Sequence, residues 1–188
     1  NSLNFNEQSL SIDVSLHIGS FIAVMIYFYK EIINFFDNKI LFLKIFASSI
    51  PAMIIGFVLV KLELIELFRN IEVIAWMTIL FGILLFISDK FELKKEIKSD
   101  FNYKSAIIIG LFQILSLIPG VSRAGITITA ARLLNFKRVD AAKISFLLSI
   151  PILGAVSIFG LYSIFFSDNI EIAKLNLLSM FLSFLFSL

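Results

Sequence analysis

The chain has 188 residues, of which 59% are hydrophobic and only 16% are charged. A soluble globular chain typically carries about 45–50% apolar and about 25% charged residues, so this composition argues against a soluble domain and favours a protein surrounded by lipid. The net charge of +2 is too small to suggest a nucleic-acid partner. Without cysteine the chain has no disulfide framework, no thiolate nucleophile and no cysteine-based metal site.

Five apolar stretches approach the roughly 20 residues that a helix needs to cross a hydrocarbon core about 30 Å thick. They predict an all-α polytopic membrane protein, with spans at about residues 14–29, 40–60, 71–87, 144–166 and 175–188. The first residues lack an initiator methionine and the basic start of a signal peptide, and the last lie within an apolar run. We therefore expect a single transmembrane domain over residues 1–188, truncated at both ends.

The pattern changes between residues 105 and 134. A short apolar stretch (105–118) and a shorter one (126–134) flank the helix breakers Pro119 and Gly120, and Arg123 puts a charge at the break. Two short helices around such a break predict a re-entrant helical hairpin, because irregular backbone at membrane depth is tolerated only where protein or a water-filled cavity satisfies its polar groups. The alternative is one kinked span that contains Arg123.

Lysines concentrate in two of the predicted loops, residues 30–44 and residues 90–104, whereas the loop between them, residues 61–72, balances its basic residues with glutamates. The positive-inside rule places the two lysine-rich loops in the cytoplasm. Residues 137–143, after the second short helix, are basic again. A hairpin that enters and leaves from the cytoplasm places them on that side too, which supports the re-entrant interpretation.

Arg123 is the strongest chemical signal in the sequence. An arginine at the bilayer centre costs about 2.5–3.5 kcal/mol on insertion scales, so it indicates a functional site. Its guanidinium forks onto two oxygens of a phosphate. The alternative is a Pro-Gly kink whose arginine pairs with a carboxylate elsewhere.

The neighbours of Arg123 suit the same anion. Gly120 and Gly125 let the backbone turn tightly and approach a ligand, and a helix that resumes near Gly125 offers N–H groups to it. Ser122 and Thr127 offer hydroxyl donors. These residue types in an apolar chain predict a site for a lipid phosphate.

The segment Leu117-Ile118-Pro119-Gly120-Val121-Ser122-Arg123-Ala124-Gly125-Ile126-Thr127 resembles the P-G-x-S-R-S-G-x-T signature of the undecaprenyl-diphosphate phosphatases, the bacitracin-resistance family. The similarity continues through residues 110–113 and 142–151, and residues 16–20 resemble the segment before the family's long span. The resemblance thus covers essentially the whole chain, and its nine-residue signature is specific.

This resemblance implies hydrolysis of undecaprenyl diphosphate to undecaprenyl phosphate and phosphate in the inner (plasma) membrane of a bacterium. That reaction recycles the lipid carrier of cell-wall synthesis and confers bacitracin resistance. The implied fold is an inverted-repeat helix bundle in which two re-entrant hairpins meet. Arg123 would bind the diphosphate, with Ser122 and Thr127 as hydroxyl contacts at the catalytic site and Gly120 and Gly125 as substrate-binding positions.

The sequence departs from the family pattern in two places. Ala124 replaces the serine after the arginine. The second signature, E-x-x-x-E followed by P-V-S-S-x-x-H, is absent and is expected upstream of Asn1, so no metal ligand is assigned here to the divalent cation (Mg²⁺ or Ca²⁺) that the family implies. Glu92 and Glu96 share the E-x-x-x-E spacing but lie in a lysine-rich loop, and we interpret them as solvated. We expect the 188 residues alone to be inactive.

Three further residues are weaker candidates. Gln113 precedes Pro119 by six residues, and either contacts the substrate or packs between helices. His17 fits an interfacial position better than a general base, and Arg132 is expected to end the second short helix at the cytoplasmic surface.

Two rival functions stay open: a secondary transporter, whose broken helices also present helix N-termini to anions, and a non-catalytic lipid-phosphate binding protein. The expected partners are a polyprenyl diphosphate and membrane lipid, with a homodimer left open.

Overall fold

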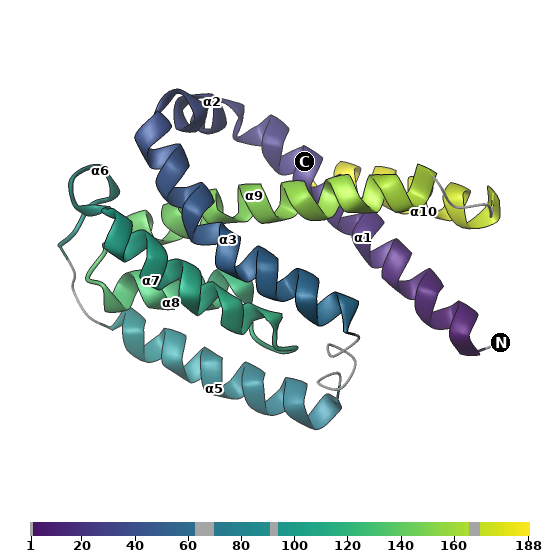
Figure 1. Cartoon of the computed structure of the whole chain (residues 1–188), viewed down its shortest axis with the longest axis horizontal. Helices are drawn as coiled ribbons and strands as arrows, with labels where there is room; N and C mark the ends of the chain where they lie inside the picture. Colours follow the sequence, from purple (N-terminus) through teal and green to yellow (C-terminus); the bar gives the residue numbers. More distant parts are fainter. Residues whose placement is uncertain (1, 63–69, 91–93, 166–169) are drawn as a thin grey trace. The chain divides into compact units, whose positions relative to one another are not determined.

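The computed structural model describes residues 2–62, 70–90, 94–165 and 170–188 (Figure 1). These ranges are helical apart from turns, short connections and one isolated bridge between Lys95 and Phe136. The chain divides into two compact units, Asn1–Lys39 with Ile150–Leu188, and Ile40–Ser149. The prediction of an all-α protein is confirmed.

Small residues bring two helices of the first unit together, α1 (Ser2–Tyr27) and α10 (Ile170–Ser187). A Cβ atom at Gly19 would lie 2.9 Å from the backbone nitrogen of Phe184, so the two backbones approach closely only because this position is glycine. The hydroxyls of Ser20 and Ser183 lie 2.8 Å apart across the contact. Contacts of this kind, built from small residues and hydroxyls, are typical of helix pairs in membranes.

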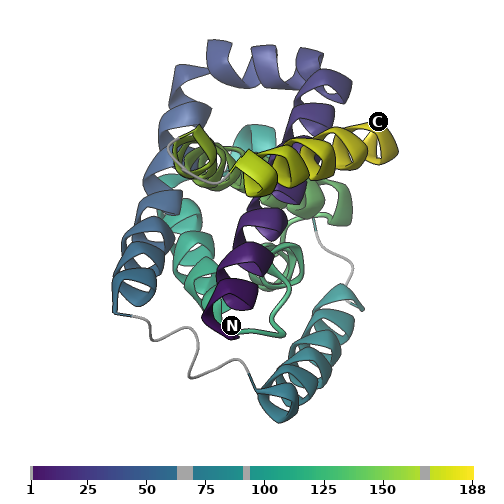
Figure 2. The same cartoon turned by 90° about the vertical axis from the view of Figure 1, so that its right-hand side faces the viewer.

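The helix α2 (Tyr29–Asp37) departs from the sequence-based expectation. The first apolar stretch was predicted to continue to residue 29, but α1 ends at Tyr27 and α2 lies across its end (Figure 2). Ile32 and Phe35 of α2 are buried, whereas most of its other described side chains are exposed. This i, i+3 spacing of buried residues is that of a short amphipathic helix.

Three helices in the described ranges are long and apolar enough to cross a membrane, and the chain is therefore a membrane protein. They fall within α3 (Lys39–Lys61), α5 (Ile71–Asp89) and α9 (Arg138–Phe165). Shorter apolar helices cover Val14–Tyr27, Tyr103–Leu117 and Lys174–Ser187. The exact span limits stay predictions, and residue 166, the predicted end of the fourth span, lies outside the described residues.

The second unit contains a helical hairpin at the place where the sequence predicted a break. α7 (Tyr103–Ile114) continues into the short 3-10 helix η1 (Leu115–Leu117), the chain turns, and α8 (Arg123–Leu133) packs back along α7 (Figure 1). We call residues 103–133 the hairpin and residues 113–123 its tip. α8 also packs against α5.

The two ends of the hairpin meet at what we call its base, residues 95–101 and 132–140. The backbone N–H of Lys95 donates to Asn135 (3.0 Å), and the carbonyl of Lys95 accepts from the N–H of Lys137 (3.0 Å). Between these bonds Phe136 is fully buried, with its ring edge-on to Phe101. The chain therefore returns, after α8, to the place where it entered α7.

Candidate functional site

The start of α8 is set by Ser122. Its Oγ atom accepts a hydrogen bond from the N–H of Gly125 (3.2 Å), and its extended backbone is that of an N-cap residue. The helix therefore begins at Arg123, two residues before Gly125, near which it was predicted to resume. Because the first N–H groups of a helix have no acceptor within it, those of Arg123 and Ala124 point out of the helix start. This is the local arrangement that binds anions.

Gly120 makes the turn that leads to this helix start. Its φ of +94° lies in the region that favours glycine. A Cβ atom there would also lie 2.9 Å from the Cα atom of Ile74 in α5, and the carbonyl of Gly120 accepts from Thr78 Oγ1 (3.1 Å). Gly120 was predicted as a substrate-binding position. The structure gives a separate reason for glycine here, because only glycine allows the tip to pack this closely against α5.

Arg123 is only partly exposed at the first position of α8. Its Nη1 atom is buried and has no hydrogen-bond partner among the residues that the structure describes. The ion pairs within those same residues involve other side chains. A buried guanidinium nitrogen without a partner is costly, so this atom is a ready donor to an anion.

Gln113 lies at the other side of the tip, one residue before the end of α7. Its side chain is fully buried, and neither Nε2 nor Oε1 has a hydrogen-bond partner within the described part of the chain. It continues the buried stripe of α7 that includes Ala106, Ile109 and Gly110. The structure thus places Gln113 and Arg123 at the same end of the hairpin, each with unpaired buried polar atoms.

Thr127 has a different setting. Its hydroxyl donates to the carbonyl of Arg123 (2.9 Å) and lies 2.7 Å from the hydroxyl of Ser145 in α9. The side chain is 1% exposed. Thr127 therefore joins α8 to α9, and its predicted hydroxyl contact with a substrate stays a prediction.

Gly125 supports the cap from inside the helix. A Cβ atom there would lie 3.2 Å from the Cβ and 3.4 Å from the Oγ of Ser122, which is tighter than ordinary packing. Alanine at this position would press on the capping hydroxyl. Gly125 and Ser122 thus belong together through the geometry of the helix start, and the substrate-binding role of Gly125 stays a prediction.

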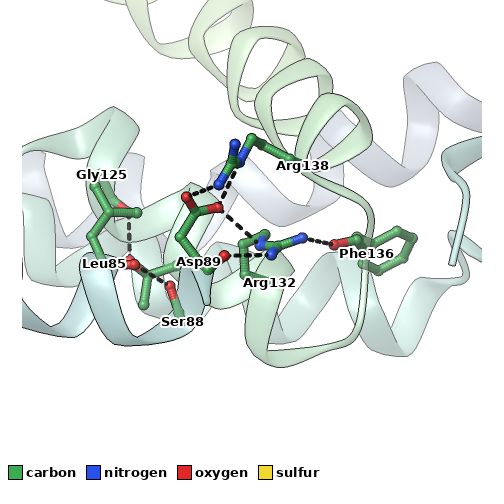
Figure 3. Close-up of polar contacts among 8 residues, drawn as sticks. Leu85, Ser88, Asp89, Gly125, Arg132, Phe136 and Arg138 are labelled. Carbon is green, nitrogen blue, oxygen red and sulfur yellow. Dashed lines mark hydrogen bonds and ion pairs between the residues drawn. The ribbon is translucent and has the colours of Figure 1, made fainter. Parts of the chain in front are cut away.

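The burial of Arg132 was not predicted from the sequence. Arg132 does end α8, as expected, but it is 5% exposed instead of lying at a surface. Its guanidinium donates to the carbonyls of Phe136 (3.2 Å) and Asp89 (3.0 Å), and Nε lies 3.4 Å from the Asp89 carboxylate. Figure 3 shows Arg138 of α9 reaching the same carboxylate, with Nε donating to Oδ1 (2.9 Å).

This cluster links α5, α8 and α9 at the base. Only Arg132 carried a sequence signal, as a charge at the end of an apolar run, and Asp89 is 43 residues away from it in the chain. The correction has a physical reason: a buried arginine needs partners, and here a distant carboxylate and two carbonyls supply them.

The acidic side chains offer little to a divalent cation. The described residues contain no group of three or more His, Cys, Asp or Glu side chains placed to hold a metal ion. Glu96 is exposed and pairs with Lys137, whose pKa it raises through this hydrogen bond, while Glu92 lies outside the described residues. His17 is exposed on α1. The described donor set does not fit the implied cation, whose ligands remain a prediction for the upstream segment.

Comparison with known proteins gives a family for the whole chain. The model of the family "Bacitracin resistance protein BacA" matches residues 1–188. The chain is 48% identical over 184 residues to an undecaprenyl-diphosphatase of Pelagibacter ubique, covering 97% of this chain and 72% of that protein. It is 39% identical over 172 residues to one of Pelobacter propionicus, covering 84% and 63%, and 39% identical over 158 residues to one of Roseobacter denitrificans, covering 77% and 59%. The chain thus spans between 59% and 72% of the length of these relatives.

Proposed function

Because the chain belongs to the BacA family of bacitracin resistance proteins, we propose that it takes part in the hydrolysis of undecaprenyl diphosphate to undecaprenyl phosphate and phosphate. The relatives named above carry the name undecaprenyl-diphosphatase. In this role the protein recycles the lipid carrier of cell-wall synthesis in the bacterial inner membrane and confers bacitracin resistance. A homodimer remains a prediction.

The observation that carries this proposal is the unpaired Nη1 atom of Arg123 at the start of α8. Phosphoryl transfer asks a protein mainly for positioning and for stabilisation of negative charge. The guanidinium would bind two phosphate oxygens, and the N–H groups of Arg123 and Ala124 would donate to others. Ser122 keeps one hydroxyl hydrogen to donate, because its oxygen serves as the acceptor in the cap.

The apolar surroundings suit the rest of the substrate. The long helices α3 and α5 expose apolar side chains along their length, a surface that suits lipid tails. Expulsion of water around the phosphates would strengthen the charge interactions at the helix start, since Coulomb energies grow as the local dielectric constant falls. The divalent cation that the family resemblance implies would neutralise part of the diphosphate charge.

We also propose that the hairpin is re-entrant. Lys44, at the start of α3, donates to the carbonyl of Phe101 (2.6 Å), and Lys137 pairs with Glu96. Three basic segments of the chain therefore meet at the base, on the side that the positive-inside rule assigns to the cytoplasm. The tip lies against Ile74 of α5. Asp89, which pairs with Arg132 of the base, follows fifteen residues or about 22 Å of helix later. These positions support a hairpin that reaches deep into the membrane and returns.

Cysteine labelling tests this topology, and the chain has no cysteine of its own to interfere. Lys98→Cys and Lys137→Cys should both react with an impermeant thiol reagent only from the cytoplasm. Lys61→Cys, at the far end of α3, serves as the control and should react only from the other side. Labelling of positions 98 and 137 from opposite sides would replace the hairpin with a span.

Phosphate release tests the activity itself. We define the extended protein as the chain preceded by the upstream segment that the family resemblance implies. The extended protein in detergent should release phosphate from undecaprenyl diphosphate with Mg²⁺, whereas the 188 residues alone should release none, because their described part holds no acidic cluster for the metal. Substrate uptake into vesicles without phosphate release would favour the transporter, and binding without either would favour the lipid-phosphate binding protein.

A further inference from the structure

The side-chain amide of Gln113 makes no hydrogen bond within the described part of the hairpin. Its side chain is fully buried, yet both of its polar atoms lack a partner within the described residues. Buried polar groups in native proteins are nearly always hydrogen-bonded, and exceptions point to a ligand, a bound water or a catalytic role. Packing between helices does not account for a buried amide without hydrogen bonds, so a ligand is the better explanation.

The position of Gln113 is fixed by its surroundings. A Cβ atom at Gly110, one turn earlier, would lie 2.8 Å from the carbonyl carbon of Ser48, so α3 and α7 cross in close contact just before Gln113. After it, the carbonyl of Gln113 accepts from Ser116 Oγ (2.7 Å). The backbone is thus held on both sides, and the amide stays buried near the break.

The unpaired atoms at the tip include two hydrogen-bond donors that suit the same kind of ligand. Arg123 Nη1 is a donor, Gln113 Oε1 is an acceptor and Gln113 Nε2 is a second donor. Because neither donor has a partner within the described residues, Nε2 and Nη1 can both donate to a ligand at the tip. The group that would satisfy Nε2 is an oxygen acceptor held next to the guanidinium, and a phosphate oxygen fits that description.

We propose that Gln113 is a phosphate-binding residue of this site: its Nε2 donates to a phosphate oxygen of the polyprenyl diphosphate that Arg123 also binds. This inference rests on the proposed function for the identity of the ligand. It adds a neutral donor on α7 to the cationic group on α8, so that both arms of the hairpin contact the same phosphate group.

The test is Gln113→Met in the extended protein, because methionine is unbranched, of similar length and unable to donate. Since the amide has no partner to lose among the residues that the structure describes, the melting temperature without substrate should stay the same or rise. The value of kcat/KM for phosphate release should fall about 10- to 100-fold, the range expected for a hydrogen bond to a charged group. Thr129→Val is the matched control: it also removes a buried polar group of the hairpin, but one that bonds the carbonyl of Gly125 (2.8 Å), so it should lower the melting temperature and leave kcat/KM unchanged.

A second measurement separates this inference from the proposed function. Inorganic diphosphate should raise the melting temperature of the extended protein, and Gln113→Met should reduce that rise, even if no lipid substrate is hydrolysed. A Gln113→Met protein that keeps kcat/KM and the diphosphate-induced rise would overturn the proposal. So would a fall in the substrate-free melting temperature, because the amide would then have a partner in the protein.

Discussion

Arg123 and Arg132 lie at opposite ends of α8, and the second unit surrounds their guanidinium groups in different ways. At the base, Arg132 bonds two backbone carbonyls and pairs with Asp89, which Arg138 also holds (Figure 3). At the tip, Arg123 keeps a buried Nη1 atom without a partner among the described residues. The same residue type on one helix is thus satisfied by protein at one end and left open at the other.

The difference separates structure from function. Burying a charge is expensive, and a protein that only needs stability pairs it fully or replaces it with an apolar residue. Arg132 meets that requirement and ties α5, α8 and α9 together. Arg123 does not, and a strained or unsatisfied group that persists in a fold is expected where a ligand binds. The comparison therefore predicts that substitution of Arg123 lowers turnover, whereas substitution of Arg132 lowers stability.

The largest effect is expected for Arg123→Ala in the extended protein. Loss of a charged group that stabilises the transferring phosphate should lower kcat about 100- to 1,000-fold. The melting temperature without substrate should change little, because Nη1 has no hydrogen bond to lose within the described part of the chain. Phosphate release and thermal unfolding of the same preparation give both values. A large drop in melting temperature would mean that Arg123 has a protein partner after all.

Arg132→Ala should show the opposite pattern. It removes two hydrogen bonds from a charged donor and the link to Asp89, so the free energy of unfolding should fall by about 3–5 kcal/mol, as for the loss of one partner of a buried ion pair. Denaturant titration in detergent measures this change. Phosphate release per folded molecule should stay near that of the wild type, and a loss as large as that of Arg123→Ala would contradict the division between base and tip.

Thr127 lies one turn after Arg123, so its substitution tests how far the functional end of α8 extends. Thr127→Val removes the hydroxyl that bonds the Arg123 carbonyl and meets Ser145, and should lower the free energy of unfolding by about 1 kcal/mol. Thr127→Ser should restore most of it. If Thr127→Val instead keeps its stability and loses turnover, Thr127 belongs with Arg123 as a hydroxyl contact of the substrate.

Much of this arrangement follows from the sequence. Pro119 and Gly120 located the break, and the charge of Arg123 marked the site. The start of α8 was predicted near Gly125, two residues late, because Ala124 and Gly125 interrupt the apolar pattern and the Ser122 cap was not foreseen. The bend before α2 was missed because residues 28–29 contain no helix breaker.

Side-chain pairing across the fold was the harder part. The burial of Arg132 depends on Asp89, which belongs to another helix, and no local pattern links them. Likewise, Gln113 lies on an apolar helix face where either packing or contact with a ligand was consistent with the sequence. Only the packing of α7 reveals that its amide is buried and unpaired.

The most direct test of the central claim compares Arg123→Lys with Arg132→Lys in the extended protein. Both substitutions keep the charge, but lysine lacks the planar fork that holds two oxygens. We predict that Arg123→Lys lowers the rate of phosphate release from undecaprenyl diphosphate about 10- to 100-fold, as expected for loss of a charge-assisted hydrogen bond, while Arg132→Lys changes it by less than about twofold. A rate for Arg123→Lys within about twofold of the wild type would contradict the account and remove Arg123 from the site.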